Sequence, residues 1–204
     1  MIKSNSSTGE RLTIDSEPFA RGKERACFLH PLDPGKIIKI STGSEDTQSR
    51  REITFFEDLQ KRGVSDFRHL PRYFGTVETN LGRGLVLELI CDANGEISRS
   101  LQWYLENGIE ISQAESLLGE LKQYLLDNLI IFNHDLFSGN LLLQKKAGDS
   151  AKLIVIDGLG DVVSIGWLNY FPFHVRSKIE RRWERLMDRF YRNKYVANRR
   201  EEHL

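Results

Sequence analysis

The first ninety residues alternate between apolar and polar positions, whereas the later part of the chain has apolar residues at helical spacing. In residues 36–40, Ile38 and Ile40 face one side while Ile37 and Lys39 face the other, which predicts a strand. Further strands are predicted at residues 11–14, 27–30, 71–77 and 85–90. The pattern therefore indicates a β-rich first half, with an irregular loop at residues 18–25.

One helix is predicted inside this β-rich part, at residues 46–62, where apolar residues recur at helical spacing before a glycine. Glu52 lies four residues before Phe56 and therefore shares the buried face of this helix. A carboxylate in that position needs a partner, and Lys39 of the preceding strand is the candidate. A strand lysine also fits a surface position with a buried stem, so both interpretations stay open for Lys39.

The second half of the chain is predicted to be helical. Ser112 and Glu115 have capping-box spacing before a helix at residues 113–128, and a basic amphipathic helix is predicted at about residues 175–195. A loop at residues 91–96 separates this half from the first. The predicted lobes are residues 1–91, rich in strands, and residues 92–204, rich in helices.

Composition excludes several classes of protein. Lys+Arg and Asp+Glu both number 29, so the net charge is zero and binding to nucleic acid is not expected. No apolar run approaches the ~18–20 residues that span a bilayer, and the polar start lacks a signal-peptide core. Cys27 and Cys91 lie in apolar, strand-like contexts, and we expect both to be buried and reduced in a cytoplasmic protein.

The strongest chemical signal is the segment Asn-His-Asp-Leu-Phe-Ser-Gly-Asn at residues 133–140. Asp135 and Asn140 stand between two apolar runs, and Asp157 closes a later apolar run before a glycine turn. Kinases build their catalytic and metal loops in this way: one Asp accepts the substrate hydroxyl proton, while an Asn and a second Asp hold magnesium. Asp and Asn also cap ordinary turns, but the upstream strand lysine and helix glutamate, in kinase order, favour the kinase arrangement.

Similarity to a known family runs over nearly the whole chain. The segments that carry it are Ala20–Lys23, His30-Pro31, Pro71–Thr79, the loop at residues 133–140, and Asp157 with Gly160. On these residues the chain resembles the YrbL family of PhoP regulatory network proteins, which is similar to the protein-kinase-like superfold. The resemblance implies an α+β, two-lobed protein-kinase-like fold, a nucleotide as binding partner and a link to envelope-stress regulation.

The resemblance also implies cofactors and residue roles. ATP and Mg²⁺ would be the cofactors, and a hydroxyl of an unknown acceptor would receive the phosphate. Asp135 would be the catalytic base, with Asn140 and Asp157 as magnesium ligands. The residues expected to hold the nucleotide are Gly22 and Lys23 near the phosphates, Lys39 as phosphate clamp, Glu52 as its orienting partner, and the Glu88 carbonyl and Ile90 amide at the adenine.

Several positions depart from the kinase pattern. Ala20 and Arg25 replace two of the three loop glycines, so Lys23 or Arg25 would have to add positive charge at the phosphates. Phe137 stands where protein kinases have a lysine, and only 47 residues follow Asp157, too few for their substrate platform. A nucleotide-binding pseudokinase with a regulatory or scaffold role is therefore the alternative to an active enzyme. The intact set of Asp, Asn, Lys and Glu residues opposes that alternative.

The basic helix near the end of the chain has two interpretations. It packs on the second lobe with its basic face in solvent, or it contacts an anionic membrane surface or a phosphorylated substrate. Its predicted apolar stripe comprises Ile179, Trp183, Leu186 and Phe190. Its predicted basic face comprises Arg176, Lys178, Arg181, Arg182, Arg185, Arg189 and Arg192.

Overall fold

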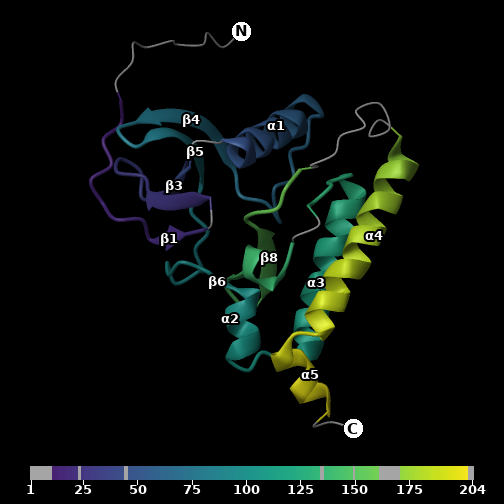
Figure 1. Ribbon diagram of the computed structural model, residues 1–204. Coiled ribbons are helices and arrows are strands. Elements are labelled where there is room, and N and C mark those ends of the chain that lie inside the picture. The colour runs from purple at the N-terminus through teal and green to yellow at the C-terminus, as the bar shows by residue number, and fades with distance from the viewer. Residues whose placement is uncertain are drawn as a thin grey trace. The chain divides into compact units, whose positions relative to one another are not determined.

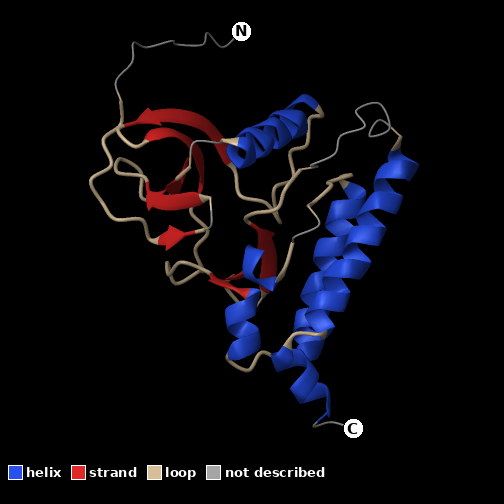
Figure 2. Ribbon diagram, in the orientation of Figure 1, coloured by secondary structure: helices blue, strands red, loops and turns tan. Residues whose placement is uncertain are grey.

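The computed structural model describes residues 11–22, 24–43, 46–133, 136–148, 150–160 and 171–201. The fold is α+β, with strands and helices both well represented (Figure 2). The chain forms two compact units, which consist of residues up to Ile53 with Arg72–Leu89, and of Thr54–Pro71 with Ile90 onward. The third and last change of unit falls between Leu89 and Ile90, and residues 54–71 group with the second unit, so neither unit is one continuous stretch of chain.

The first unit is built around a five-stranded antiparallel sheet with the order β1-β2-β3-β5-β4 (Figure 1). Its strands are β1 (Ala20–Arg21), β2 (Arg25–Leu29), β3 (Lys36–Ser41), β4 (Tyr73–Thr79) and β5 (Gly82–Glu88). Four of these were predicted to within a few residues. The short strand β1 pairs with β2 inside the segment predicted to be an irregular loop, so that part of the prediction was wrong.

One face of this sheet carries the hydrophobic core of the first unit. Ile38 and Ile40 are buried there, as the alternation in β3 predicted. The cluster comprises Ile14, Ala26, Phe28, Ile38, Ile40 and Val86. Gly84 of β5 packs directly against it, because a Cβ at this position would lie 2.3 Å from Cγ2 of Ile38. Any larger residue at position 84 would therefore displace the β3 side chain.

Helix α1 (Thr47–Lys61) follows β3 and agrees with the predicted helix. Its first residues belong to the first unit, whereas its later residues, including the buried Phe56 and Leu59, belong to the second. The chain beyond α1 is fixed to the second unit by hydrogen bonds. Arg62 donates to the carbonyl of Asn128, and the hydroxyl of Tyr124 donates to the carbonyl of Asp66 at 2.6 Å.

The second unit combines a small antiparallel sheet, in the order β6-β7-β8, with most of the helices (Figure 1). Its elements are β6 (Arg99–Ser100), α2 (Leu101–Glu106), α3 (Ile111–Asp127), the 3₁₀ helix η1 (Ser138–Asn140), β7 (Leu141–Lys145), β8 (Ala151–Val155), α4 (Pro172–Tyr191) and α5 (Lys194–Glu201). Helices α3 and α4 lie side by side. Lys122 and Glu180 join them by an ion pair of 2.7 Å, and the Tyr191 hydroxyl donates to Glu115 at 2.8 Å.

Three details of this unit differ from the sequence-based expectation. Helix α3 begins at Ile111 with Glu110 as its N-cap residue and no side-chain capping bond, so the predicted Ser112/Glu115 capping box is wrong. Helix α2 was not predicted, although Ser100 caps it by accepting a hydrogen bond from Trp103 N–H. The basic segment forms two helices, α4 and α5, and not one continuous helix.

Burial also corrects two expectations. Cys27 and Cys91 were expected to be buried, but both are half-buried, and neither forms a disulfide in the described part of the chain. Arg182, which was predicted on the solvated face of the basic helix, is only 3% exposed. In the described part of the chain, no helix combines the length and the apolar character that crossing a bilayer requires.

His69 is a buried titratable group of the second unit. Its Nδ1 donates to the Leu153 carbonyl at 2.7 Å, and its ring packs against Tyr124 with 4.9 Å between ring centroids. Burial lowers the pKa of His69, because desolvation disfavours the charged imidazolium, and the bond to the Leu153 carbonyl opposes this only in part. The residue is therefore a neutral, hydrogen-bonded packing group.

Candidate functional site

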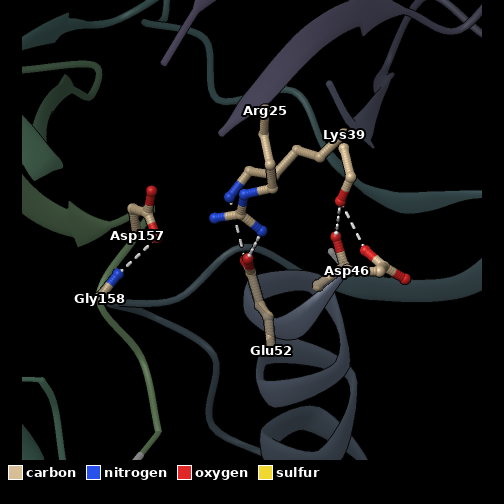
Figure 3. Close-up of polar contacts among 8 residues, drawn as sticks. Arg25, Lys39, Asp46, Glu52, Asp157 and Gly158 are labelled. Atoms are coloured by element: carbon tan, nitrogen blue, oxygen red, sulfur yellow. Dashed lines mark hydrogen bonds and ion pairs between the residues drawn. The ribbon is translucent and has the colours of Figure 1, made fainter. Parts of the chain in front are cut away.

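The first unit contains a buried cluster of charged side chains on the sheet face opposite its hydrophobic core (Figure 3). Nζ of Lys39 lies 3.0 Å from Oε1 of Glu52, and the Arg25 guanidinium contacts the other carboxylate oxygen, Oε2. The three residues are 5%, 3% and 4% exposed, respectively. One carboxylate of α1 thus receives one cation from each of two neighbouring strands.

Strand register explains why both cations reach the same carboxylate. Cys27 pairs with Lys39 and Arg25 pairs with Ser41, so the side chains of Arg25 and Lys39 project from the same face as diagonal neighbours. Glu52 faces them from α1, one helical turn from the buried Ser49. The predicted pairing of Lys39 with Glu52 is therefore present, and β3 and α1 are joined by a polar layer.

The Arg25 side chain does not lie where the comparison of residues 20–25 with the glycine-rich phosphate loop of kinases suggested. Arg25 was, with Lys23, one of two residues that could add charge at a phosphate, but its side chain is buried against Glu52. In the same hairpin, Gly22 N–H donates to the Arg25 carbonyl at 2.8 Å, so this amide is engaged within the turn. No local sequence pattern located Arg25, because it fell in the segment 18–25 that was predicted to be an irregular loop.

Asn140 and Asp157, the predicted magnesium ligands, are brought together in the second unit. Asn140 ends η1 and precedes β7, whereas Asp157 follows β8, the hairpin partner of β7. The amide of Ile156 donates to the Asn140 carbonyl at 3.0 Å, which places the two candidate ligands on adjoining backbone segments. The hairpin between residues 141 and 155 thus connects the two backbone segments, while the roles of Asn140 and Asp157 as magnesium ligands stay predictions.

The segment before residue 134 also pairs with the segment after Asp157. Asn133 N–H donates to the Gly158 carbonyl, Gly160 N–H donates to the Ile131 carbonyl at 3.2 Å, and Phe132 forms an antiparallel bridge with Leu159. Gly158 has a φ of +76°, in the left-handed region that favours glycine. These bonds tie residues 131–133 to residues 158–160.

Asp157 is half-buried, and its Oδ1 accepts a hydrogen bond of 2.7 Å from Gly158 N–H (Figure 3). Among the described residues, no three His, Cys, Asp or Glu side chains come together as a metal cluster. Mg²⁺ bound through one or two protein oxygens plus substrate phosphates does not need such a cluster. The carboxylate of Asp157 and the amide oxygen of Asn140 are hard oxygen donors of the type that Mg²⁺ prefers.

Arg182 is a residue of this region that sequence reasoning missed. From α4 it donates a hydrogen bond to the Phe132 carbonyl, just before the candidate catalytic loop, and the neighbouring Trp183 packs edge-on against the Phe132 ring at 6.2 Å. A buried arginine is rare unless its charge has partners, and the Phe132 carbonyl is one partner of Arg182. Its spacing from Ile179 and Leu186 puts it at the edge of the apolar stripe, which by itself does not decide whether it is buried.

The remaining predicted site residues are distributed as follows. Glu88 ends β5 and its carboxylate accepts from Arg72 N–H at 3.1 Å. Ile90 is 4% exposed, and its carbonyl accepts from Ser98 N–H at 3.0 Å. Their roles as adenine contacts stay predictions. Lys23 and Asp135 lie outside the described residues.

Comparison with known proteins identifies the family. The family description "PhoP regulatory network protein YrbL" matches residues 12–191. The chain belongs to the YrbL family. It is 32% identical over 179 residues to a protein of Escherichia coli (strain K12) named "Uncharacterized protein YrbL", and the match covers 85% of this chain and 84% of the relative. A protein of the same name from Shigella flexneri matches with the same identity and coverage.

Proposed function

We propose that the chain is a minimal kinase-like phosphotransferase that uses ATP-Mg²⁺ to phosphorylate a hydroxyl group. The observation that carries the proposal is the buried ion pair of Lys39 and Glu52 between β3 and α1. In kinases, a strand lysine contacts the nucleotide phosphates and a helix glutamate orients it. A lysine buried with a carboxylate at 3.0 Å is not a snorkelling surface residue, so the alternative interpretation of Lys39 loses its support.

A two-lobed protein-kinase-like fold is part of the proposal. The support is the five-stranded antiparallel sheet of the first unit, with α1 inserted after the lysine strand, and the helical second unit with its loop–hairpin–loop segment. Catalysis of phosphoryl transfer depends mostly on positioning and charge neutralisation. Two observations support such positioning: Lys39 is paired with Glu52, and the Ile156 amide next to Asp157 is bonded to the Asn140 carbonyl.

The proposed roles in the second unit follow from its backbone bonds. Asn140 and Asp157 would hold Mg²⁺, which neutralises charge on the phosphates, and Asp135 would accept the proton of the acceptor hydroxyl. The hydrogen bond between Ile156 and Asn140 supports a joint metal site, since it holds both ligands on paired backbone. Gly22, Lys23, Glu88 and Ile90 complete the proposed nucleotide contacts.

A nucleotide-binding pseudokinase with a regulatory role is the second candidate. The observation that favours it is the hairpin of residues 20–27, in which Gly22 N–H is bonded to the Arg25 carbonyl and the Arg25 side chain is buried on Glu52. The Gly22 amide and the Arg25 guanidinium are therefore engaged within the protein and do not form a phosphate-binding loop of the usual glycine-rich kind. The family description, which names the PhoP regulatory network, fits either candidate. Both candidate functions include a cytoplasmic location, where ATP and Mg²⁺ are abundant.

Thermal unfolding with ATP, in the presence of Mg²⁺ or of a chelator, tests the shared premise. A ligand that binds only the folded chain stabilises it by RT ln(1 + [L]/Kd), which is about 2.7 kcal/mol at one hundred times Kd. We expect a rise in midpoint that depends on Mg²⁺. No metal-dependent rise at millimolar ATP would contradict both candidates. Turnover of ATP then separates the enzyme from the pseudokinase.

A further inference from the structure

The second unit contains a cavity of about 190 Å³ next to the loop that carries Asn140. Its residues come from α2, α3, the segment 137–141, α4 and the junction between α4 and α5. The buried part of its apolar wall comprises Leu101, Leu118, Leu141, Leu186 and Phe190, all at most 5% exposed, and Phe137, 47% exposed, lies at its edge. This volume is below the ~300–1,000 Å³ of pockets for drug-sized ligands, so the cavity fits a small molecule and not a nucleotide.

The polar side of the cavity is organised around Gln102 of α2. Its Oε1 accepts hydrogen bonds from the Ser138 hydroxyl at 2.6 Å and from Asn193 Nδ2 at 2.8 Å, while its Nε2 donates to Glu106 at 2.8 Å. Three separate segments of the chain are therefore joined at one amide. Ser138 belongs to the same loop as Asn140, so this side of the cavity is fixed to the candidate catalytic loop.

Two arginines of the basic segment border the cavity, Arg189 and Arg192. Nε of Arg192 lies 3.0 Å from Asp188, but the two side chains are 78% and 55% exposed. Exposed ion pairs of this kind contribute about 0–1 kcal/mol, so Arg192 can turn to an anion at little cost. Guanidinium groups present paired donors that match a carboxylate, sulfonate or phosphate group.

We propose that this cavity binds a small organic anion, with the charged group at Arg189 and Arg192 and an apolar body against the leucine wall. Buried apolar surface supplies affinity, and the convergent polar groups supply orientation, which is the usual design of small-molecule sites. The inference goes beyond the proposed phosphotransfer and does not depend on it. It also gives the basic segment a specific role, since two of its arginines stand at a cavity.

Two probes of equal shape test the charge requirement. Benzenesulfonate and benzenesulfonamide differ in charge but share the phenyl ring and the sulfonyl group. Binding to the full chain is measured by ligand-observed NMR without nucleotide. We expect benzenesulfonate to bind and benzenesulfonamide to bind at least tenfold more weakly. The double variant Arg189→Gln/Arg192→Gln should lose at least tenfold in affinity for benzenesulfonate, whereas Arg176→Gln/Arg181→Gln, an equal loss of charge on exposed α4 surface, should not.

Equal binding of the two probes, or an unchanged affinity in the double variant, would overturn the inference. Sedimentation with phosphatidylglycerol vesicles separates a free small anion from a lipid headgroup. The inference predicts that the chain stays in the supernatant. Pelleting that depends on Arg189 and Arg192 would instead assign these arginines to a membrane surface and overturn the small-molecule site. None of these binding and sedimentation experiments uses ATP, so their outcome is independent of the proposed phosphotransferase activity.

Discussion

Lys39 and Glu52 form a buried ion pair with 3.0 Å between Nζ and Oε1, and Arg25 contacts the second oxygen of the same carboxylate. Removing one partner of a buried pair typically costs about 3–5 kcal/mol, because charge is left without compensation. We predict that Glu52→Gln lowers the free energy of unfolding by about this amount, measured by urea denaturation. Glu57→Gln, at an exposed position of the same helix, is the matched control and should change it by less than about 0.5 kcal/mol. Equal effects of the two changes would show that the Glu52 pair is energetically unimportant.

Lys39 should act on the nucleotide as well as on the fold. We predict that Lys39→Met weakens ATP-Mg²⁺ binding at least tenfold, measured by calorimetry, because the proposed phosphate contact is lost. Lys36→Met removes an equal charge from the same strand, where Lys36 pairs with Asp33 at 2.8 Å on a partly exposed surface. This control should bind ATP like the wild type. A folded Lys39→Met variant with unchanged ATP affinity would remove Lys39 from the proposed site.

Sequence reasoning was most successful where one local pattern determines position. The alternation of Ile38 and Lys39 and the helical face of Glu52 together predicted the ion pair. The same reasoning missed Arg25, because its place depends on the β2–β3 register, a long-range property that residue types do not encode. Arg182 was missed because a long amphipathic helix has arginines near the edge of its apolar stripe, and only tertiary packing decides which of them is buried. The Ser112/Glu115 signal failed because such spacing also occurs inside a helix, as it does in α3.

Asp157 should act through the metal. We predict that Asp157→Asn removes most of the extra thermal stabilisation that Mg²⁺ adds to ATP, since a carboxamide is a weaker Mg²⁺ ligand than a carboxylate. The readout is the difference in unfolding midpoint between ATP with Mg²⁺ and ATP with chelator. Asp127→Asn, an exposed change at the end of α3, should leave this difference intact. If Asp157→Asn retains the full Mg²⁺ effect, the metal is held elsewhere.

His69 predicts a pH dependence of stability. Burial lowers its pKa in the folded chain below the value of 6.5 for an exposed histidine. At pH values below the pKa of an exposed histidine, His69 is protonated in the unfolded chain but stays neutral in the folded chain until lower pH. The free energy of unfolding therefore falls as pH decreases. We predict that His69→Gln flattens the loss of unfolding free energy between about pH 7.5 and pH 5.5, measured by urea denaturation. His174→Gln is the control, and an unflattened profile in His69→Gln would assign the pH dependence to other groups.

ATP consumption by the pure chain with Mg²⁺, compared with that of Asp135→Asn, is the most direct test of the proposed phosphotransferase. Asp135 is assigned to the acceptor hydroxyl and not to the metal, so its replacement should leave ATP binding nearly intact. General-base contributions are typically about 10²–10⁴-fold, and we predict a loss of turnover in that range. If the wild type and Asp135→Asn bind ATP and consume it at the same slow rate, Asp135 is not a base and the chain is a pseudokinase.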